Sequence, residues 1–322
     1  MSLVLHFADE AGLAHGLARE LGWTCREIDC HVFPDGEYRL TLPRPLPPHV
    51  ALLRGLHQPN TKLAALLIAA PAARDCGAQH LTLVAPYLSY MRQDMEFRPG
   101  EAVSQRHLGQ ALASWFDALV TVDPHLHRVA TLDEVVPGRR GVCLSAAPLL
   151  GRFIADRMPG ALLLAPDEEA GQWVRAAAAA GGLDHAVCHK RRQGDHEVQV
   201  ALPGADLRGR AVVLLDDLAS TGRTLAVAAR AVLADGGASV DVAVTHGLFI
   251  GDALDTLRAA GVRHVWSSDC VPHASNAVSV VPLLAAAVRQ VAAHAPRPSR
   301  APGWPRPRPP WLRPRRRPGN SS

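Results

Sequence analysis

The sequence predicts an α/β protein of two similar domains, each built on a mostly parallel sheet that helices cover on both faces. Short apolar runs alternate with Ala- and Leu-rich stretches of helical character, and this alternation is typical of parallel sheets. The chain of 322 residues is long for one hydrophobic core but suits two domains of about 140 residues each. The apolar runs that we expect to be strands are 3–7, 50–53, 81–85, 119–122, 161–165, 211–215 and 239–244.

A turn-rich segment at residues 136–141 separates the two halves, and we place the boundary near 142–148. The expected domains are therefore 1–145 and 146–294. The remaining 28 residues, 295–322, contain nine prolines, eight arginines and no acid, and we expect a disordered tail because this composition cannot form a packed core. Without its eight arginines the formal net charge of +4 becomes −4, so the basic character belongs to the tail.

The stretch 211–224 predicts a phosphate-binding loop. An apolar run of strand character ends in two acids, and residues 225–234 have the composition of a helix. The hydroxyl-rich loop between them therefore lies at a helix N-terminus, where unpaired backbone N–H groups and the helix dipole attract phosphate. Gly222 lets the backbone approach a ligand closely. The plain alternative is an ordinary turn with Ser220 or Thr221 as the N-cap.

Two adjacent carboxyls precede this loop and can accept hydrogen bonds from vicinal hydroxyls or help to hold a divalent cation. Carboxyls and loop together suit a sugar phosphate. The string from Val213 to Thr224 resembles the phosphoribosyl-pyrophosphate loop of type I phosphoribosyltransferases and ribose-phosphate pyrophosphokinases. By this resemblance the expected ribose 5-phosphate site comprises Asp216, Asp217, Ser220, Thr221, Gly222, Arg223 and Thr224.

Two further motifs favour the pyrophosphokinases. Residues 31–38 are similar to the Phe-x-Asp-Gly-Glu element of that family, and residues 81–94 end in a sequence similar to its Pro-Tyr-x-x-Tyr-x-Arg-Gln-Asp signature. Taken alone, residues 31–38 are a polar turn between apolar stretches. An exposed Arg-Gln-Asp triplet by itself indicates no function. The resemblance implies ATP contacts, with the arginine acting by stacking and charge. The expected ATP-binding residues are Phe33, Asp35, Gly36, Glu37, Arg92, Gln93 and Asp94.

A basic triplet at residues 190–192 is the third such motif. Charge runs are usually solvated surface, but only two of the 34 basic residues are lysines, Lys62 and Lys190. A lysine kept at 190 in a chain that otherwise uses arginine suggests a need for a compact ammonium there. In the pyrophosphokinases a Lys-Arg-Arg triplet opens a loop that closes over the reacting phosphates, which implies catalytic roles for Lys190 and Arg192. For Lys62 we expect the exposed side of a helix.

The expected metal ligands are His125 and Asp167. Residues 119–125 form a strand ending in Asp and His, similar to the Asp-x-His at which the family binds magnesium through the histidine. Asp167 resembles the aspartate of the family's Ser-Pro-Asp-x-Gly-Gly strand end, near ribose and metal. We reject a zinc site at His125 and His127, because no Cys or third His stands at a metal-ligand spacing.

The sequence departs from the family pattern at two places. Glu169 and Ala170 stand where glycines are usual, and Ser220 stands where many relatives carry Asp. Negative charge beside a polyphosphate costs energy unless a metal or an arginine offsets it. The extra acids, Glu168 and Glu169, therefore put the metal stoichiometry and the substrate affinity in question.

The resemblance covers residues 3–290 and implies Mg²⁺-dependent transfer of the diphosphoryl group of ATP to the 1-hydroxyl of ribose 5-phosphate, which gives phosphoribosyl pyrophosphate and AMP for nucleotide biosynthesis. It also implies a homo-oligomer of two-domain chains, in which helix 282–292 can cross back to the first domain. We expect Val84 and Leu214 to lie at equivalent strand ends of the two halves. The alternatives are a phosphoribosyltransferase, which needs no ATP site, and a non-catalytic homologue that regulates the synthetase.

The six cysteines show no paired spacing. Acidic residues occur too close to the N-terminus for a signal peptide. We therefore expect the protein to be located in the cytoplasm, which is a reducing compartment. No apolar run approaches the roughly 20 residues that span a bilayer. Nucleic-acid binding is expected at most in the tail, where Trp304 and Trp311 among the arginines could stack on bases or dock on a partner.

Overall fold

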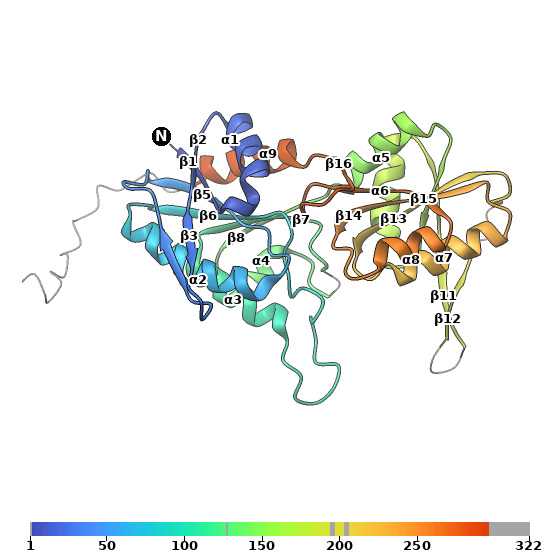
Figure 1. Cartoon of the computed structure of the whole chain (residues 1–322), viewed down its shortest axis with the longest axis horizontal. Helices are drawn as coiled ribbons and strands as arrows, with labels where there is room; N and C mark the ends of the chain where they lie inside the picture. The colour runs from blue at the N-terminus through green and yellow to red at the C-terminus, as the bar shows by residue number, and fades with distance from the viewer. Residues whose placement is uncertain (1, 127, 194–196, 203–205, 296–322) are drawn as a thin grey trace, which may run out of the picture.

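The structure, a computed structural model, describes residues 2–126, 128–193, 197–202 and 206–295, and only the backbone of 190–193 and 197–201. Two α/β domains lie side by side along the long axis of the molecule (Figure 1). This arrangement confirms the fold class that the alternation of apolar and helical stretches predicts.

The first domain is built on a six-stranded parallel sheet in the order β2-β1-β5-β6-β7-β8. Helices α2 and α3 pack on one face, and α1 packs on the other. The strands are β1 (Ser2–His6), β2 (Thr24–Glu27), β5 (His49–Leu53), β6 (His80–Ala85), β7 (Ala118–Val122) and β8 (Arg140–Leu144). The helices are η1 (Ala8–Glu10), α1 (Ala11–Leu21), α2 (Pro59–Asp75), α3 (Ser104–Trp115) and α4 (Leu132–Val135).

The second domain repeats this plan with a parallel sheet in the order β10-β9-β13-β14-β15-β16. Helices α7 and α8 cover one face, and α5 and α6 cover the other. The strands are β9 (Leu162–Ala165), β10 (Asp184–Val187), β13 (Ala211–Ala219), β14 (Ser239–Gly247), β15 (Val262–Ser268) and β16 (Asn276–Val278). The helices are α5 (Ala147–Arg157), α6 (Gly171–Gly181), α7 (Arg223–Ala234) and α8 (Ala253–Ala259).

The two sheets have the same topology. Each places its second strand at one edge, next to its first, and continues in chain order to the other edge. Each also carries an antiparallel hairpin between its second and third strands, β3 (Asp29–Val32) with β4 (Tyr38–Thr41) and β11 (His189–Gln193) with β12 (Glu197–Ala201). The expectation that Val84 and Leu214 occupy equivalent strand ends is therefore wrong by one strand, because β13 corresponds to β5 and β6 corresponds to β14.

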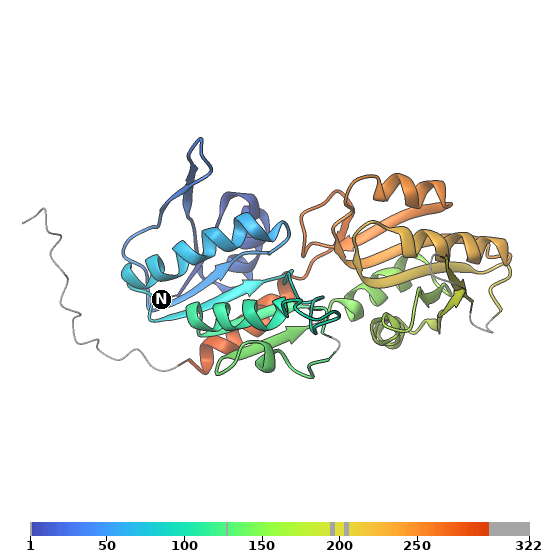
Figure 2. The same ribbon diagram turned by 90° about the horizontal axis from the view of Figure 1, so that it is seen from below.

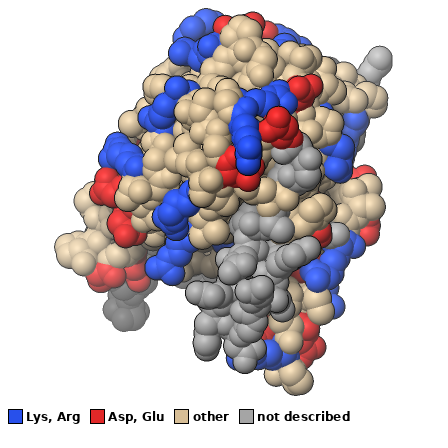
Figure 3. All heavy atoms as spheres, turned by 90° about the vertical axis from the view of Figure 1, so that its right-hand side faces the viewer, with Lys and Arg blue, Asp and Glu red and all other residues tan. Residues whose placement is uncertain are grey.

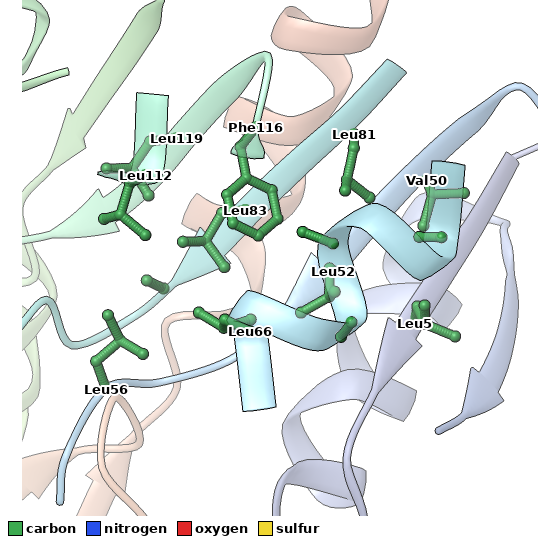
Figure 4. Close-up of a cluster of buried hydrophobic side chains, with 14 of the residues drawn as sticks. Leu5, Val50, Leu52, Leu56, Leu66, Leu81, Leu83, Leu112, Phe116 and Leu119 are labelled. Carbon is green, nitrogen blue, oxygen red and sulfur yellow. The ribbon is translucent and has the colours of Figure 1, made fainter. Parts of the chain in front are cut away.

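The seven apolar runs predicted as strands are all strands, because each is buried on both faces of a sheet. In the first domain Leu5, Leu52 and Leu83 point from β1, β5 and β6 toward Leu66 of α2 (Figure 4), and each such buried leucine stabilises the fold by about 1.5–3 kcal/mol. Val4, the residue before Leu5 on β1, points to the opposite face of the sheet and packs in the core there.

Sequence reasoning missed the strands at the sheet edges. The edge strands β2, β8, β10 and β16 are largely exposed or half-buried. The inner strand β15, which was missed as well, is only partly buried. Their positions follow from backbone pairing with a buried neighbour, which a hydrophobic pattern does not report.

The last helix, α9 (Val281–Ala293), crosses back to the first domain, as expected from the resemblance. It packs beside α1, and its residues Leu284 and Val288 join the core on that face of the first sheet. Both views place α9 with α1 rather than with the second domain (Figures 1 and 2).

Lys62 is buried, so the expectation of an exposed helix side is wrong. Its side chain is 5% exposed, and its Nζ lies 3.0 Å from Gly55 O, 2.9 Å from His57 Nε2 and 3.3 Å from Glu10 Oε1. The backbone N–H of Gly55 donates to the same Glu10 oxygen at 2.7 Å. A compact ammonium suits this position because it can donate three hydrogen bonds within a small volume.

This charge network, defined by Asp9, Glu10, Arg54, His57 and Lys62, shifts three pKa values. The charges of Arg54 and Lys62 lower the pKa of Asp9, although burial opposes the shift. Burial raises the pKa of Glu10 to about 7, although the charges of Lys62 and Arg54 oppose the shift. Burial and the charge of Lys62 lower the pKa of His57 to about 4, so its neutral ring can accept a hydrogen bond from Lys62. Arg54 is also paired with Asp9.

Candidate active site

A cavity of about 220 Å³ lies between the two domains. The first domain contributes side chains from the loops after β6 and β7, and the second contributes the ends of β9 and β13 and the start of α7. Because ligands of open parallel sheets bind at the carboxyl ends of strands, this is the expected place for a site. The lining residues are Arg92, His125, Asp167, Glu169 and all residues from Asp216 to Leu225.

The loop after β13 forms the floor of this cavity. Helix α7 begins at Arg223, and its N-cap, Gly222, has a positive φ of 71° and no side-chain cap hydrogen bond. A Cβ on Gly222 would lie 3.3 Å from Ala253 O, so a glycine is required by both conformation and space. The backbone N–H groups of Leu248 and Ile250 donate to Ala219 and Ser220 and fix the rear of the loop. The first-turn N–H groups of α7 therefore face a cavity that suits an anion.

The pKa values of Asp216 and Asp217 shift in opposite directions. Burial raises the pKa of Asp216 well above its usual value, and the neighbouring charge of Asp217 adds to the shift. Burial alone would also raise the pKa of Asp217, but the hydrogen bond and charge of His125 lower it. His125 Nδ1 lies 2.9 Å from Asp217 Oδ2, so a side chain of the first domain orients a carboxylate of the second.

Asp123, at the end of β7, joins the two domains beside the cavity. Its carboxylate accepts hydrogen bonds from Trp173 Nε1 at 2.9 Å, Thr245 Oγ1 at 2.8 Å and the backbone N–H of Ala146 at 2.9 Å. Sequence reasoning missed this role. The available signal was its place at the same strand end as His125, two residues before it.

His246 completes this junction from the second domain. Its Nε2 lies 3.0 Å from Val122 O, and its ring meets the ring of Tyr87 edge-on at 5.0 Å between centroids. Burial lowers the pKa of His246, although Asp123 and Asp217 oppose the shift. A neutral ring that donates Nε2–H to a carbonyl of the first domain is therefore a fixed contact between the sheets.

The structure does not bring the expected ATP-binding hairpin to this cavity. Residues 33–37 form the exposed turn between β3 and β4, where Phe33 N–H donates to Glu37 O at 2.9 Å and Glu37 N–H donates to Asp35 Oδ1 at 3.1 Å. None of Phe33, Asp35, Gly36 and Glu37 lines the cavity. Figure 2 shows this hairpin extending upward from the first domain and not toward the second.

Gln93 and Asp94 follow Arg92 but do not line the cavity. Gln93 Nε2 donates to Met95 O at 3.2 Å and to Glu101 Oε2 at 3.3 Å. Asp94 is nearly buried and is paired with Arg128 at 2.7 Å. In this conformation both residues hold the loop that follows Arg92.

Lys190 and Arg192 lie on β11 of the second hairpin, and their side chains are outside the described residues. The neighbouring His189 is exposed, and its Nδ1 lies 2.8 Å from Glu168 Oε1. This contact connects the hairpin to the segment after β9. Glu168 thus points toward the hairpin, whereas Glu169 lines the cavity. His127, the other half of the rejected zinc site, also lies outside the described residues.

The lining carries more acids than bases. Four carboxyl groups, on Asp167, Glu169, Asp216 and Asp217, share the cavity with the guanidinium groups of two arginines. Over the second domain's end of the molecule, by contrast, basic and acidic side chains are interspersed (Figure 3). The excess of acids suits a ligand that binds together with a cation, or one whose hydroxyl groups donate hydrogen bonds to the carboxyls.

The fold and the cavity define a two-domain α/β protein with a polar cavity between two similar lobes. Residues 3–115 match the N-terminal domain of ribose phosphate pyrophosphokinase, and residues 169–280 match the phosphoribosyl transferase domain. A ribose-phosphate pyrophosphokinase of Methanopyrus kandleri is 35% identical over 293 residues, which cover 90% of this chain and 99% of that protein. The chain belongs to the ribose-phosphate pyrophosphokinase family, which is a family of enzymes.

Two further comparisons agree. A ribose-phosphate pyrophosphokinase of Halobacterium salinarum is 32% identical over 289 residues, which cover 89% of this chain and 100% of that protein. The crystal structure of phosphoribosylpyrophosphate synthetase from Mycobacterium smegmatis has a TM-score of 0.78 at 24% identity and covers 91% of this chain and 99% of that one. The described part of the chain contains no helix that is both long and apolar enough to span a membrane.

Proposed function

We propose that the protein is a ribose-phosphate diphosphokinase, which transfers the diphosphoryl group of ATP to the 1-hydroxyl of ribose 5-phosphate and releases AMP. The single observation that carries this proposal is the common cavity of Arg92 and the loop 220–224, one from each domain. The phosphoribosyltransferase alternative needs no ATP site, and the match of residues 3–115 to a pyrophosphokinase N-terminal domain argues against it.

The loop after β13 would hold ribose 5-phosphate. The N–H groups at the start of α7 and the hydroxyls of Ser220, Thr221 and Thr224 donate to the 5-phosphate. Asp217, whose pKa His125 lowers, and Asp216 accept hydrogen bonds from the ribose hydroxyls. Arg223, the first residue of α7, adds positive charge beside the phosphate.

Arg92 would bind the nucleotide by charge and stacking. If residues 33–37 also contact ATP, a second copy of the chain must supply them, because they lie outside the cavity of their own chain. Val32 and Phe33 at this turn are 55% and 39% exposed, as suits residues that another subunit covers. This requirement supports the proposal of a homo-oligomer.

The donor set of the cavity fits Mg²⁺. The carboxyl oxygens of Asp167, Asp216 and Asp217 are the hard ligands that this ion prefers. His125 lies beside them and is the further ligand that the family resemblance implies. A bound Mg²⁺ would neutralise charge on the phosphate oxygens. The carboxyl of Glu169 is a further donor in reach of the cavity, so the number of ions is open to measurement.

In the proposed reaction the C1 oxygen of the ribose forms a bond with the β-phosphorus, the bond from that phosphorus to the bridging oxygen of AMP breaks, and the C1 hydroxyl proton goes to solvent. The protein mainly aligns the two substrates and stabilises charge on the phosphate oxygens. We assign this stabilisation to Lys190 and Arg192, because the hairpin that carries them is connected to the cavity's rim through His189 and Glu168.

One assay tests the function. Purified protein is mixed with ATP, Mg²⁺ and ribose 5-phosphate, and AMP is measured. AMP release that requires ribose 5-phosphate supports the proposal. Its absence, with ribose 5-phosphate still binding, would favour the second candidate, a non-catalytic homologue that regulates the synthetase. The acid at 169 within the cavity is the observation that favours this candidate.

We also propose a cytoplasmic location. All six cysteines are unpaired, although Cys30 and Cys143 are exposed. Free thiols at the surface persist in a reducing compartment. Fractionation of cells that express the full chain tests this proposal.

A further inference from the structure

Three side chains with nitrogen or sulfur donor atoms meet on the first domain, where β1, α1 and β2 pack together. They are His6 at the end of β1, His15 in α1 and Cys25 in β2. One donor atom from each lies within 4.8 Å of the other two. None of the three lines the cavity between the domains. We propose that His6, His15 and Cys25 form a binding site for a zinc-class transition-metal ion.

The sheet register explains why these residues converge. Val4 and His6 are two apart on β1 and therefore share a face of the sheet. Cys25 pairs with Val4 in the parallel register, so it lies on this same face. Helix α1 covers that face and brings His15 over the strand ends. Convergence thus depends on three separate elements, which is why no short metal-binding spacing marks it in the sequence.

His6 has the hydrogen bonding of a metal ligand. Its side chain is buried, and Nδ1 lies 2.9 Å from Phe7 O. Because a carbonyl oxygen can only accept, Nδ1 carries the hydrogen and Nε2 keeps a lone pair. Within the described residues no hydrogen bond to this Nε2 occurs. Metal-binding histidines commonly donate their other N–H to a backbone carbonyl, which fixes tautomer and ring orientation.

The distances require only a small contraction. Around a tetrahedral ion with bonds of about 2.0–2.3 Å, donor atoms lie about 3.3–3.7 Å apart. Closing from 4.8 Å or less shortens each distance by at most about 1.5 Å, and the exposed side chain of His15 and the half-buried one of Cys25 can rotate to provide it. The His6 and His15 rings already meet edge-on with centroids 5.4 Å apart.

The donor chemistry selects the ion. Two imidazoles and one thiolate suit Zn²⁺ or Co²⁺, whereas Mg²⁺ prefers the all-oxygen donors of the cavity between the domains. Three protein donors leave a fourth position for water. An ion held here would link β1, α1 and β2 and would stabilise the folded state by binding it alone. The site is therefore a cross-link within the first domain, independent of the reaction.

Titration with Co²⁺ tests the site on untagged, metal-free full-length protein. A thiolate–Co²⁺ bond gives a near-ultraviolet charge-transfer band that oxygen ligands do not give. We expect this band to saturate at one ion per chain, to persist in excess Mg²⁺ and to disappear when Zn²⁺ displaces Co²⁺. Zn²⁺ should also raise the melting temperature. Failure to observe a charge-transfer band would overturn the proposal.

Three variants locate the ligands. Cys25→Ser should abolish the band, and His15→Ala should weaken Co²⁺ binding at least about tenfold. His15 is exposed, so its loss leaves the fold intact and keeps the test valid even if Cys25→Ser is unstable. Cys30→Ser, which removes an exposed thiol outside the cluster, should change nothing. An unchanged band in His15→Ala, or a band lost in Cys30→Ser, would contradict the assignment.

Discussion

The loops after the third strand of each sheet differ, although the two sheets share one topology. In the second domain the loop after β13 is lined with hydroxyls and opens into the cavity. In the first domain the loop after β5 is bonded to the protein itself, since Glu10 accepts the N–H of Gly55 and Lys62 donates to Gly55 O. One copy of the fold has an internal carboxylate bonded to this loop, and the other has hydroxyls along it. Function therefore depends on the loop, not on the fold.

The acids that follow the first strand of each sheet show the same contrast. Asp9 and Glu10 follow β1 and are neutralised by Arg54 and Lys62. Asp167 and Glu169 follow β9 and line the cavity. A buried carboxylate needs a partner, and in the first domain the protein provides it.

The two hairpins offer the largest test of this contrast. Lys190→Ala in the second hairpin should lower kcat by about 10³-fold or more, because an ammonium that stabilises charge in the transition state is lost. The KM for ribose 5-phosphate should change little. Steady-state kinetics of AMP release measures both. Arg191→Ala, at a neighbouring position with no assigned role, is the control, and near-normal turnover of Lys190→Ala would remove the role of that lysine.

Lys62→Met tests the loop after β5. Removal of one partner from a buried ion pair should lower the free energy of unfolding by about 3–4 kcal/mol at a pH above 7, where Glu10 is ionised. Urea denaturation measures this change. Adding Glu10→Gln should restore much of the stability, because the unpaired charge is then absent. A single variant as stable as the parent protein would show that the pair contributes nothing.

A matched pair of glycines separates the two loops. Gly222→Ala forces a side chain into a positive φ and toward Ala253 O, and it should raise the KM for ribose 5-phosphate about 100-fold, roughly 2.7 kcal/mol. Gly55→Ala places a Cβ 3.3 Å from Glu10 Oε1 and should lower stability by about 1–2 kcal/mol with unchanged KM. The opposite pattern would contradict our assignment of one loop to binding and the other to structure.

The last prediction concerns pH. The pKa of Glu10 is raised from 4.5 to about 7, so the folded state binds its proton more tightly than the unfolded state. Stability from this group is complete below about pH 4.5 and is lost as pH rises through 7. The free energy of unfolding should fall by roughly 3 kcal/mol across this window. Glu10→Gln should flatten that slope in urea denaturation at several pH values, and an equal slope in both proteins would refute the assignment.

The sequence predicts the buried strands and the loop 220–224 because both are local patterns. A two-sided apolar run and a strand–loop–helix junction need no knowledge of distant residues. That Arg92 and His125 line the same cavity as Asp217 was expected only from the family resemblance, because the residues come from two different domains. The bridging role of Asp123 depends on Trp173 and could not be read from the segment 119–125.

Lys62 shows where pattern reasoning fails. Helix α2 is apolar nearly all round, with Leu67 and Ile68 exposed at 54% and 41%, so its periodicity does not identify the buried side. The scarcity of lysine was the better signal. This scarcity singled out both Lys190 and Lys62. The structure places Lys62 in a hydrogen-bond network that needs a compact ammonium.

The return of α9 has a consequence for biosynthesis. Val84 and Leu17, made early, pack with Leu284 and Val288, which are among the last core residues of the first domain to leave the ribosome. At about 5–20 residues per second, the nascent first domain waits about 10–30 s for its closing helix while the whole second domain is being made. Chaperone dependence should therefore follow the time needed to translate the second domain.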